Sequence, residues 1–243
     1  PGHGKTTVLI NMLARAIDKG NRAMFFSREL PNSELLKKII CLESQQLSYS
    51  EIRKNMFTET SKEILNQGIE IVRKKYSKDK FLMFDNIKDF SLSANEVKKF
   101  KPDIIFDDYI QLIAYQGKEE QRRLQIENLV NNYKWLAKEM NCVVVLASQL
   151  NRGIESRGGK FVPQLSDLAE SGAIEQVAEN VFFTFYDYKI KGDEGKGQDV
   201  LTISAGKVRY GNTGVVDLGY KGDRCKIYNS MEEMNNGNGT IPF

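Results

Sequence analysis

The chain has 243 residues, 41% of them hydrophobic and 28% charged, with a formal net charge of +3 at pH 7. These values predict one soluble globular domain with a sizeable core, and so mild a charge does not by itself indicate nucleic-acid binding. The single histidine excludes a zinc site and a histidine-based triad, and the three widely separated cysteines suit a reducing cytoplasm. No apolar run approaches the ~18 residues of a membrane span.

The first seven residues of the chain have the pattern of a phosphate-binding loop that runs into a helix. The full motif is a glycine, four free positions and Gly-Lys-Ser/Thr, so its leading glycine is expected upstream of Pro1 and the chain begins inside the motif. Glycines let backbone N–H groups turn toward phosphates, the lysine adds positive charge, and the threonine hydroxyl is placed to ligate Mg²⁺. An accidental glycine-rich turn is the alternative. The candidate nucleotide-binding residues are Gly2, His3, Gly4, Lys5, Thr6 and Thr7, and Thr6 is also a candidate metal ligand.

A helix and a buried strand are predicted after this loop. Residues 7–17 carry apolar side chains nearly all round, which is typical of a helix packed on a sheet, and Ala23–Ser27 is a continuous apolar strand. Glu29 comes directly after that strand, where ligands bind in open α/β sheets, so it is a candidate general base. The alternative is a solvated acid in the loop before the helix start predicted at Pro31–Glu34.

The next part of the chain is predicted to supply a second acidic group. The expected elements are helices over 34–76, a strand over 81–85, a helix capped by 93–96 that runs through 100, and a buried strand over 103–109. That last strand ends in Asp107 and Asp108. An aspartate in this position suits the Mg²⁺ side of a nucleotide site, but the pattern alone does not choose between the two.

A further strand is predicted to end in a polar amide. A polar loop over 115–121 precedes an amphipathic helix over 122–140, and the apolar run 142–148 is another buried strand. Gln149 follows that strand, where a neutral amide can sense a γ-phosphate and pass the signal to the loop behind it. The loop behind Gln149 covers residues 151–163 and contains the basic residues Arg152, Arg157 and Lys160. The alternative interpretation is an ordinary exposed loop.

The C-terminal part is predicted to add strands and a tail. Residues 165–172 are expected to lead into a helix that runs through 178. The other expected elements are a strand over 181–186, an exposed turn over 189–198, a strand over 200–204, and a hairpin of 215–220 and 226–228. Lys207 and Arg209 follow the 200–204 strand just before a turn, a position where basic residues are usually solvated. The tail, 230–243, is polar and expected to be disordered, so the globular domain is predicted over 1–229.

The order of these elements resembles a RecA-type ATPase, and several strings resemble the replicative DNA helicases of the DnaB family. The strings follow the family's order over nearly the whole chain and are Pro1–Thr6, Phe25–Leu30, Asp108–Leu112, Ser148–Gly153, Leu165–Gln176, and Lys207 and Arg209 with Gly211 and Gly214. The resemblance implies an α/β fold with a RecA-like, mostly parallel twisted sheet flanked by helices and a C-terminal antiparallel hairpin extension.

The resemblance also implies roles for the candidate residues. It aligns the second of the two acids, Asp108, with the Mg²⁺-associated aspartate of the family. Glu29 resembles the base that activates the attacking water, and Gln149 resembles the γ-phosphate sensor. Lys207 and Arg209 resemble a pair that reaches into the neighbouring subunit's nucleotide. The implied site therefore lies between two subunits.

The implied activity is that of a helicase motor that uses ATP and Mg²⁺ to move along single-stranded DNA and unwind duplex. The family resemblance implies a homohexamer whose channel loops grip the strand's backbone without regard to sequence. Ala169 stands where the family commonly has a basic residue. The candidate DNA-binding residues are Arg152, Arg157, Lys160, Glu170 and Gly172.

Partners and alternatives complete the expectations. Primase and a helicase loader are implied partners, no membrane partner is expected, and the expected location is the cytoplasm of a bacterial cell or a phage-infected host. The family's amino-terminal primase-interacting domain is not part of this sequence, and the spacing before Asp108 resembles a phage-borne relative. Two other classes stay open: a RecA-like recombinase or repair ATPase that forms filaments, and a nucleotide-gated assembly module without appreciable turnover.

Overall fold

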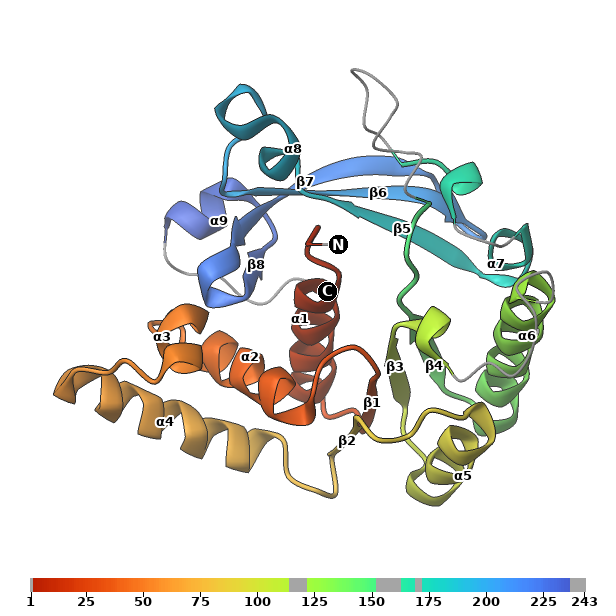
Figure 1. Cartoon of the computed structure of the whole chain (residues 1–243), viewed down its shortest axis with the longest axis horizontal. Helices are drawn as coiled ribbons and strands as arrows, with labels where there is room; N and C mark the ends of the chain where they lie inside the picture. Colours follow the sequence, from red (N-terminus) through yellow and green to blue (C-terminus); the bar gives the residue numbers. More distant parts are fainter. Residues whose placement is uncertain (1, 114–121, 152–162, 169–171, 237–243) are drawn as a thin grey trace.

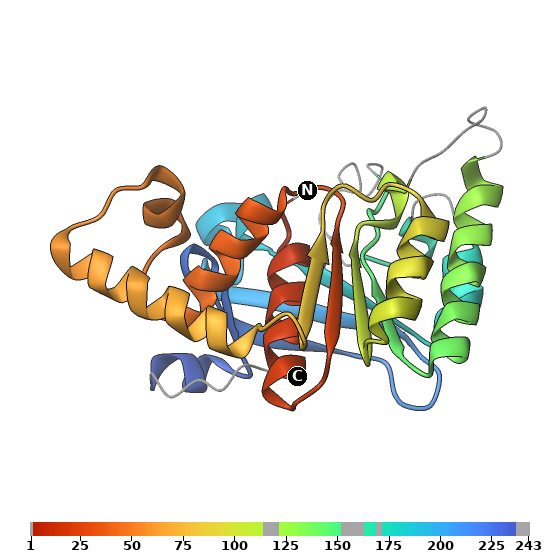
Figure 2. The ribbon, with the colours of Figure 1, turned by 90° about the horizontal axis from the view of Figure 1, so that it is seen from below.

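A computed structural model describes residues 2–113, 122–151, 163–168 and 172–236. It contains two four-stranded sheets, with strand orders β2-β1-β3-β4 and β5-β6-β7-β8. Helix α1 (Lys5–Asp18) lies between them (Figures 1 and 2), because one of its faces packs on the first sheet and another on the second. The predicted RecA-like plan of a mostly parallel sheet flanked by helices, with an antiparallel C-terminal part, is confirmed.

The first sheet is parallel throughout. Its central strand β1 is buried at every position, as expected of an apolar strand covered on both faces. Ser27 at the end of β1 lies in register with Asp108 at the end of β3, so the carboxyl ends of these strands share one edge of the sheet. The strands are β1 (Ala23–Ser27), β2 (Phe81–Phe84), β3 (Ile104–Asp108) and β4 (Val143–Leu146).

Two apolar cores cover the two faces of the parallel sheet. One combines α1 to α4 with Phe25 and Phe106, and the other combines α5 and α6 with Met24 and Ile105. Successive strand residues point to opposite faces, so neighbouring residues of β1 and β3 enter different cores. The covering helices are α2 (Asn32–Ser44), α3 (Tyr49–Lys54), α4 (Glu59–Lys75), α5 (Phe90–Phe100) and α6 (Arg122–Met140). No helix in the described part of the chain is both long enough and apolar enough to cross a bilayer.

Helix α5 begins earlier than the sequence pattern predicts. The Asp89 carboxylate accepts hydrogen bonds from two backbone N–H groups of the first turn, at 2.7 and 3.2 Å. Asp89 is therefore the residue that caps this helix, as acidic and hydroxyl side chains commonly do. Ser93, the cap that the pattern predicts, lies inside the helix and donates its hydroxyl to the Asp89 carbonyl at 2.9 Å.

The second sheet is antiparallel and larger than the predicted hairpin. The hairpin of β7 and β8 forms, but β5 and β6 extend it to four strands. The stretch expected to be an exposed turn instead contains a short helix, α8 (Tyr188–Lys191). Another short helix, α7 (Gly172–Val177), precedes the sheet. The strands are β5 (Asn180–Phe185), β6 (Val200–Val208), β7 (Gly214–Lys221) and β8 (Lys226–Tyr228).

The first part of the tail is helical, contrary to the expected disorder from residue 230. In α9 (Met231–Asn235) the Ser230 hydroxyl oxygen accepts a hydrogen bond from the Glu233 N–H at 3.1 Å. The Met234 side chain is only 8% exposed, because α9 packs on β7 and β8. The expected disorder is therefore wrong for residues 231–235, and residues 237–243 lie outside the described part.

A fully buried asparagine fastens α1 to the second sheet. The Asn11 amide nitrogen donates to the carbonyls of Thr7 at 2.7 Å and Cys225 at 2.9 Å. Its carbonyl oxygen accepts from the Ile227 N–H at 3.1 Å. Because buried polar groups are costly unless they are hydrogen-bonded, this arrangement specifies where α1 sits against β8. The helix that begins at the phosphate loop is thus held from both sides.

Candidate nucleotide-binding site

The phosphate loop enters α1 through glycines in the left-handed backbone region. Gly2 and Gly4 have φ angles of 82° and 81°, which residues with a side chain rarely adopt. Gly4 directly precedes α1, and its carbonyl accepts a helical hydrogen bond from Val8 at 2.8 Å. The N–H groups of the first turn point toward the loop, as they do where helix N-termini bind anions.

Thr6 and Asp108 meet at the edge of the parallel sheet. The Thr6 hydroxyl, in the first turn of α1, donates to Asp108 Oδ2 at 2.6 Å. Asp108 is 2% exposed, and its other oxygen, Oδ1, has no hydrogen-bond partner among the described residues. Burial raises the pKa of Asp108, while the Thr6 hydrogen bond and the Lys5 charge oppose that shift. The two predicted metal ligands are therefore adjacent.

Lys5 places a buried ammonium beside this pair. Its Nζ makes no hydrogen bond to any residue that the structure describes, and it lies 4.6 Å from the centre of the Tyr109 ring. Burial lowers the pKa of Lys5, and the charges of Asp108 and Glu29 oppose the shift. A buried cation without a hydrogen-bond acceptor requires an explanation, and a phosphate at the loop provides one.

Glu29 lies on the same edge, two residues beyond the end of β1. The N–H groups of Arg28 and Glu29 donate to the Asp108 carbonyl at 2.9 and 3.3 Å, so the end of β3 positions this segment. The Glu29 side chain is exposed, and its charge acts on the pKa values of Lys5, Asp108 and Tyr109. Glu29 thus stands next to Lys5 and Asp108, where a base acting on a water beside the nucleotide is needed.

Asp107 has a different role from its neighbour. Both of its oxygens accept hydrogen bonds from Arg28, at 2.7 and 2.6 Å, and one also accepts from the Tyr133 hydroxyl. The two charged side chains are 2% and 0% exposed. Arg28 also donates to the Ile87 carbonyl at 2.7 Å. Asp107 is therefore part of a buried ion pair with Arg28 at the end of the parallel sheet, and Tyr133 of α6 hydrogen-bonds to it. The sequence pattern did not indicate the participation of Arg28 or Tyr133.

Gln149 follows β4 and is linked to the segment after β3. The Gln111 side chain donates to the Ser148 hydroxyl at 2.8 Å and accepts from the Gln149 N–H at 3.3 Å. Beyond it, the Asn151 N–H donates to the Asp167 carbonyl at 2.8 Å. Hydrogen bonds thus join the acid strand to the segment that leads toward the predicted DNA loops. The sensor role of the Gln149 side chain stays a prediction.

Lys207 and Arg209 do not join the Lys5 site within one chain. A Cβ added to Gly4 would lie 3.3 Å from Leu201, near the start of β6, whereas Lys207 is six residues further along that strand. At ~3.3 Å per residue, the separation is about 20 Å. Lys207 Nζ donates to the carbonyls of Glu175 and Gln176 at 2.5 and 3.3 Å, beside α7. Figure 1 shows this end of β6 near α6 and α7, away from the chain's N-terminus.

The predicted DNA-binding residues are only partly described. Gly172 begins α7, and a Cβ added there would lie 3.7 Å from the Arg123 guanidinium. The other candidates, Arg152, Arg157, Lys160 and Glu170, lie outside the described residues.

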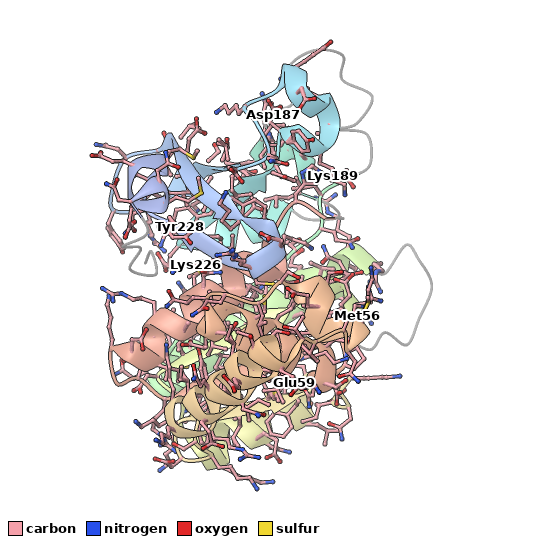
Figure 3. All side chains as sticks on the ribbon, turned by 90° about the vertical axis from the view of Figure 1, so that its left-hand side faces the viewer. Met56, Glu59, Asp187, Lys189, Lys226 and Tyr228 are labelled. Carbon is pink, nitrogen blue, oxygen red and sulfur yellow. The ribbon has the colours of Figure 1, made fainter. Side chains whose placement is uncertain are left out.

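The second sheet also reaches the phosphate loop, which the sequence did not predict. The His3 ring stacks on Phe185 with centres 6.0 Å apart, and its Nδ1 accepts from the Tyr186 N–H at 3.3 Å. Lys189 Nζ occupies the space where a Cβ on Gly2 would lie. Asp187 directly precedes α8, and Lys189 lies within α8 (Figure 3). A lysine-rich turn contains no signal for such an approach, because the contact depends on how the two sheets flank α1.

The donor set fits a nucleotide with Mg²⁺ better than a metal held by protein alone. Within the described ranges, no group of three or more histidine, cysteine or acidic residues could hold a metal ion. Thr6 and Asp108 offer two oxygen ligands, and Mg²⁺ usually takes its remaining ligands from phosphates and water. Asp108 Oδ1 and Lys5 Nζ, which lack partners in the described part of the chain, are the groups that such a complex would satisfy.

Fold and site together define a phosphate-loop nucleotide-binding protein with a RecA-like core. The chain belongs to the DnaB-like helicase C terminal domain family, whose model matches residues 1–229. The family resemblance expected from the sequence is thereby confirmed.

Relatives and solved structures agree with this assignment. The replicative DNA helicase DnaB of Haemophilus influenzae is 30% identical over 241 residues, which cover 96% of this chain and 50% of the relative. DnaB of Mycoplasma genitalium is 32% identical, with 92% of this chain and 49% of the relative covered. The chain thus spans about half the length of the curated relatives it matches.

Two solved structures have closely similar folds. One is described as an ATPase domain, and it matches with a TM-score of 0.84 at 25% identity over 94% of this chain and 81% of that one. The other is a DnaB-like replicative helicase, studied with its interactions with primase, which gives a TM-score of 0.83 and covers 93% and 55% of the two chains. Its 24% identity supports the fold alone.

Proposed function

We propose that this chain is the ATP-hydrolysing motor domain of a replicative DNA helicase. The observation that carries the proposal is the meeting of Thr6 with Asp108 at 2.6 Å beside the Lys5 ammonium, which has no acceptor in the described part of the chain. Together with the glycine loop, these groups offer positive charge, backbone N–H groups and two oxygen ligands at one point. Membership of the DnaB-like C-terminal family supports a helicase over a recombinase.

Each residue then has one task in hydrolysis. The loop N–H groups and Lys5 would bind the β- and γ-phosphates, and Thr6 and Asp108 would hold Mg²⁺, which would neutralise charge on the phosphate oxygens. Glu29 accepts the proton of the water that attacks the γ-phosphate, because it is an exposed carboxylate whose backbone N–H is held on the Asp108 carbonyl at 3.3 Å. Gln149 responds to the presence of that phosphate.

The basic pair on β6 acts on the nucleotide of a neighbouring subunit. Within one chain, Lys207 lies about 20 Å along β6 from the phosphate loop, which is too far for direct contact. A homohexameric ring brings the pair of one subunit to the loop of the next. Arginine supplied in this way stabilises charge on the transferring phosphoryl group. Hydrolysis thereby becomes dependent on subunit assembly.

Single-stranded DNA is the proposed track. Hydrogen bonds link Gln149 to Gln111 after β3, and Asn151 to Asp167, and these residues flank the proposed channel loops in the sequence. In those loops Arg152, Arg157, Lys160, Glu170 and Gly172 are the candidates for backbone contacts, with the strong salt dependence typical of phosphate binding. A primase and a helicase loader are the proposed partners of the whole protein, in keeping with membership of the DnaB-like family, and a cytoplasmic location completes the proposal.

The proposal is tested with Glu29→Gln in the full-length protein. We expect hydrolysis of ATP and unwinding of forked DNA to fall about 10²- to 10⁴-fold with nucleotide binding retained, because the substitution removes only the base. The matched control is Glu59→Gln on α4 (Figure 3), an acid whose side chain is 89% exposed and paired locally with Lys62. Wild-type hydrolysis and unwinding by Glu29→Gln would show that the assigned base is wrong.

A further inference from the structure

Glu179 lies between the predicted trans-acting arginine and helix α6. It directly precedes β5, and both of its carboxylate oxygens accept hydrogen bonds from Arg209 Nη1 at 3.0 Å. The same carboxylate forms an ion pair with Lys134 of α6. The backbone adds a further link, since the Arg209 N–H donates to the Glu179 carbonyl at 3.0 Å. Figure 1 shows α6 and the ends of β5 and β6 side by side in this region.

The region around Glu179 has an excess of positive charge. Burial lowers the pKa of Lys134, and three nearby cations lower it further: Arg209, Lys138 and Lys207. Cations packed this closely repel one another, and a carboxylate among them reduces that repulsion. Glu179 therefore determines where the Arg209 guanidinium can rest.

We propose that Glu179 is a positioning residue for Arg209. It holds the guanidinium at the end of β6, while Lys207 is held by the Glu175 and Gln176 carbonyls, so that the basic pair has a defined direction before it meets the phosphates of the neighbouring subunit's nucleotide. Positioning reduces the side-chain freedom that Arg209 must lose on binding. The inference rests on the proposed function of Lys207 and Arg209 in trans.

A purely structural role for Glu179 makes a different prediction. Through Lys134, Glu179 also ties α6 to the edge of the second sheet, and loss of that tie would disturb the domain whatever residue occupies position 209. A positioning role, in contrast, disappears when the arginine is absent. A double-mutant cycle separates the two, because it measures whether one residue acts through the other.

The experiment uses the full-length protein, with steady-state ATP hydrolysis measured in the presence of single-stranded DNA. We expect Glu179→Gln to lower kcat about fivefold, which corresponds to ~1 kcal/mol, the upper range for a partly exposed charge pair. KM for ATP should stay unchanged, because the nucleotide is bound by the phosphate loop of the other subunit. In an Arg209→Ala background, Glu179→Gln should cause no further loss. Glu179→Asp, which keeps the charge, should recover part of kcat.

The matched control is Asp217→Asn, which breaks the Lys196–Asp217 ion pair of 2.7 Å elsewhere on the same sheet and should leave kcat unchanged. An unchanged or raised kcat for Glu179→Gln, or an equal loss in the Arg209→Ala background, would overturn the inference. If Arg209→Ala hydrolyses ATP at the wild-type rate, both the trans role of Arg209 and the positioning role of Glu179 fail. Impaired Arg209→Ala with normal Glu179→Gln defeats the positioning role alone.

Discussion

The buried ion pair between Arg28 and Asp107 yields a large and specific stability prediction. Their side chains are 2% and 0% exposed, and Arg28 donates to both Asp107 oxygens at 2.7 and 2.6 Å. Methionine in place of Arg28 keeps an unbranched apolar side chain but leaves the carboxylate without its cation. Removing one partner of a buried pair costs about 3–5 kcal/mol, so we expect Arg28→Met to lower the free energy of unfolding by that amount near neutral pH.

The loss should depend on pH. Burial raises the pKa of Asp107, whereas the hydrogen bonds and charge of Arg28 and the Tyr133 hydroxyl oppose the rise, so removing Arg28 raises the pKa further. Between the pKa of the unfolded chain and the raised pKa of the folded variant, the folded state holds a proton on Asp107 that the unfolded chain has released. The free energy of unfolding of the variant therefore falls as pH rises through this range. The difference in unfolding free energy between wild type and variant should therefore be larger at about pH 8 than at about pH 5.

Urea unfolding followed by far-ultraviolet circular dichroism at the two pH values measures this difference. The control is Arg73→Met, which removes an exposed ion pair with Glu70. The Arg73 and Glu70 side chains are 72% and 56% exposed, so this substitution should lower the free energy of unfolding by less than ~1 kcal/mol. A loss for Arg28→Met no larger than that of the control, or one that grows as pH falls, would refute the reasoning.

The other predictions concern the phosphate loop, the contact of α1 with the second sheet, and the packing of α9. Lys5→Ala should weaken ATP binding by about 10- to 100-fold in a fluorescent-nucleotide titration, since it removes a charged phosphate contact, and unchanged affinity would contradict the assignment. Asn11→Ala should lower the unfolding free energy by about 2–4 kcal/mol in urea, because it leaves buried backbone groups of β8 and the residue before it unpaired; a loss below ~0.5 kcal/mol would count against that role. Met234→Ala should cost about 2 kcal/mol by the same assay, and no change would mean that α9 adds nothing to the core.

Much of the parallel half of the molecule could be predicted from the sequence. Its strands are short, continuous apolar runs bounded by polar residues, and three of them lead to a group with recognisable chemistry: Glu29 after β1, Asp108 at the end of β3 and Gln149 after β4. Parallel strands bring their carboxyl ends to one edge, so the grouping of these residues follows from local pattern and strand direction.

The antiparallel half was predicted less well, because its organisation depends on contacts between distant segments. Local patterns predicted strands near all four positions, 181–186, 200–204, 215–220 and 226–228, but they could not show that β5 pairs with β6 and extends the hairpin to four strands. Likewise, the polar composition of the tail predicted disorder, whereas one side chain, Met234, finds a buried place against β7. Composition reports average behaviour, and a single packed residue can override it.

What the sequence determined by itself is the phosphate-loop chemistry and the placement of two adjacent acids at the end of one strand. Only the tertiary structure assigned different partners to those acids. Successive residues of β3 face opposite sides, so Asp108 meets Thr6 of α1 while Asp107 meets Arg28 and Tyr133 in the other core. Which helix covers which face is set by packing across the whole sheet, and that packing separates the acid of the nucleotide site from the acid of the structural ion pair.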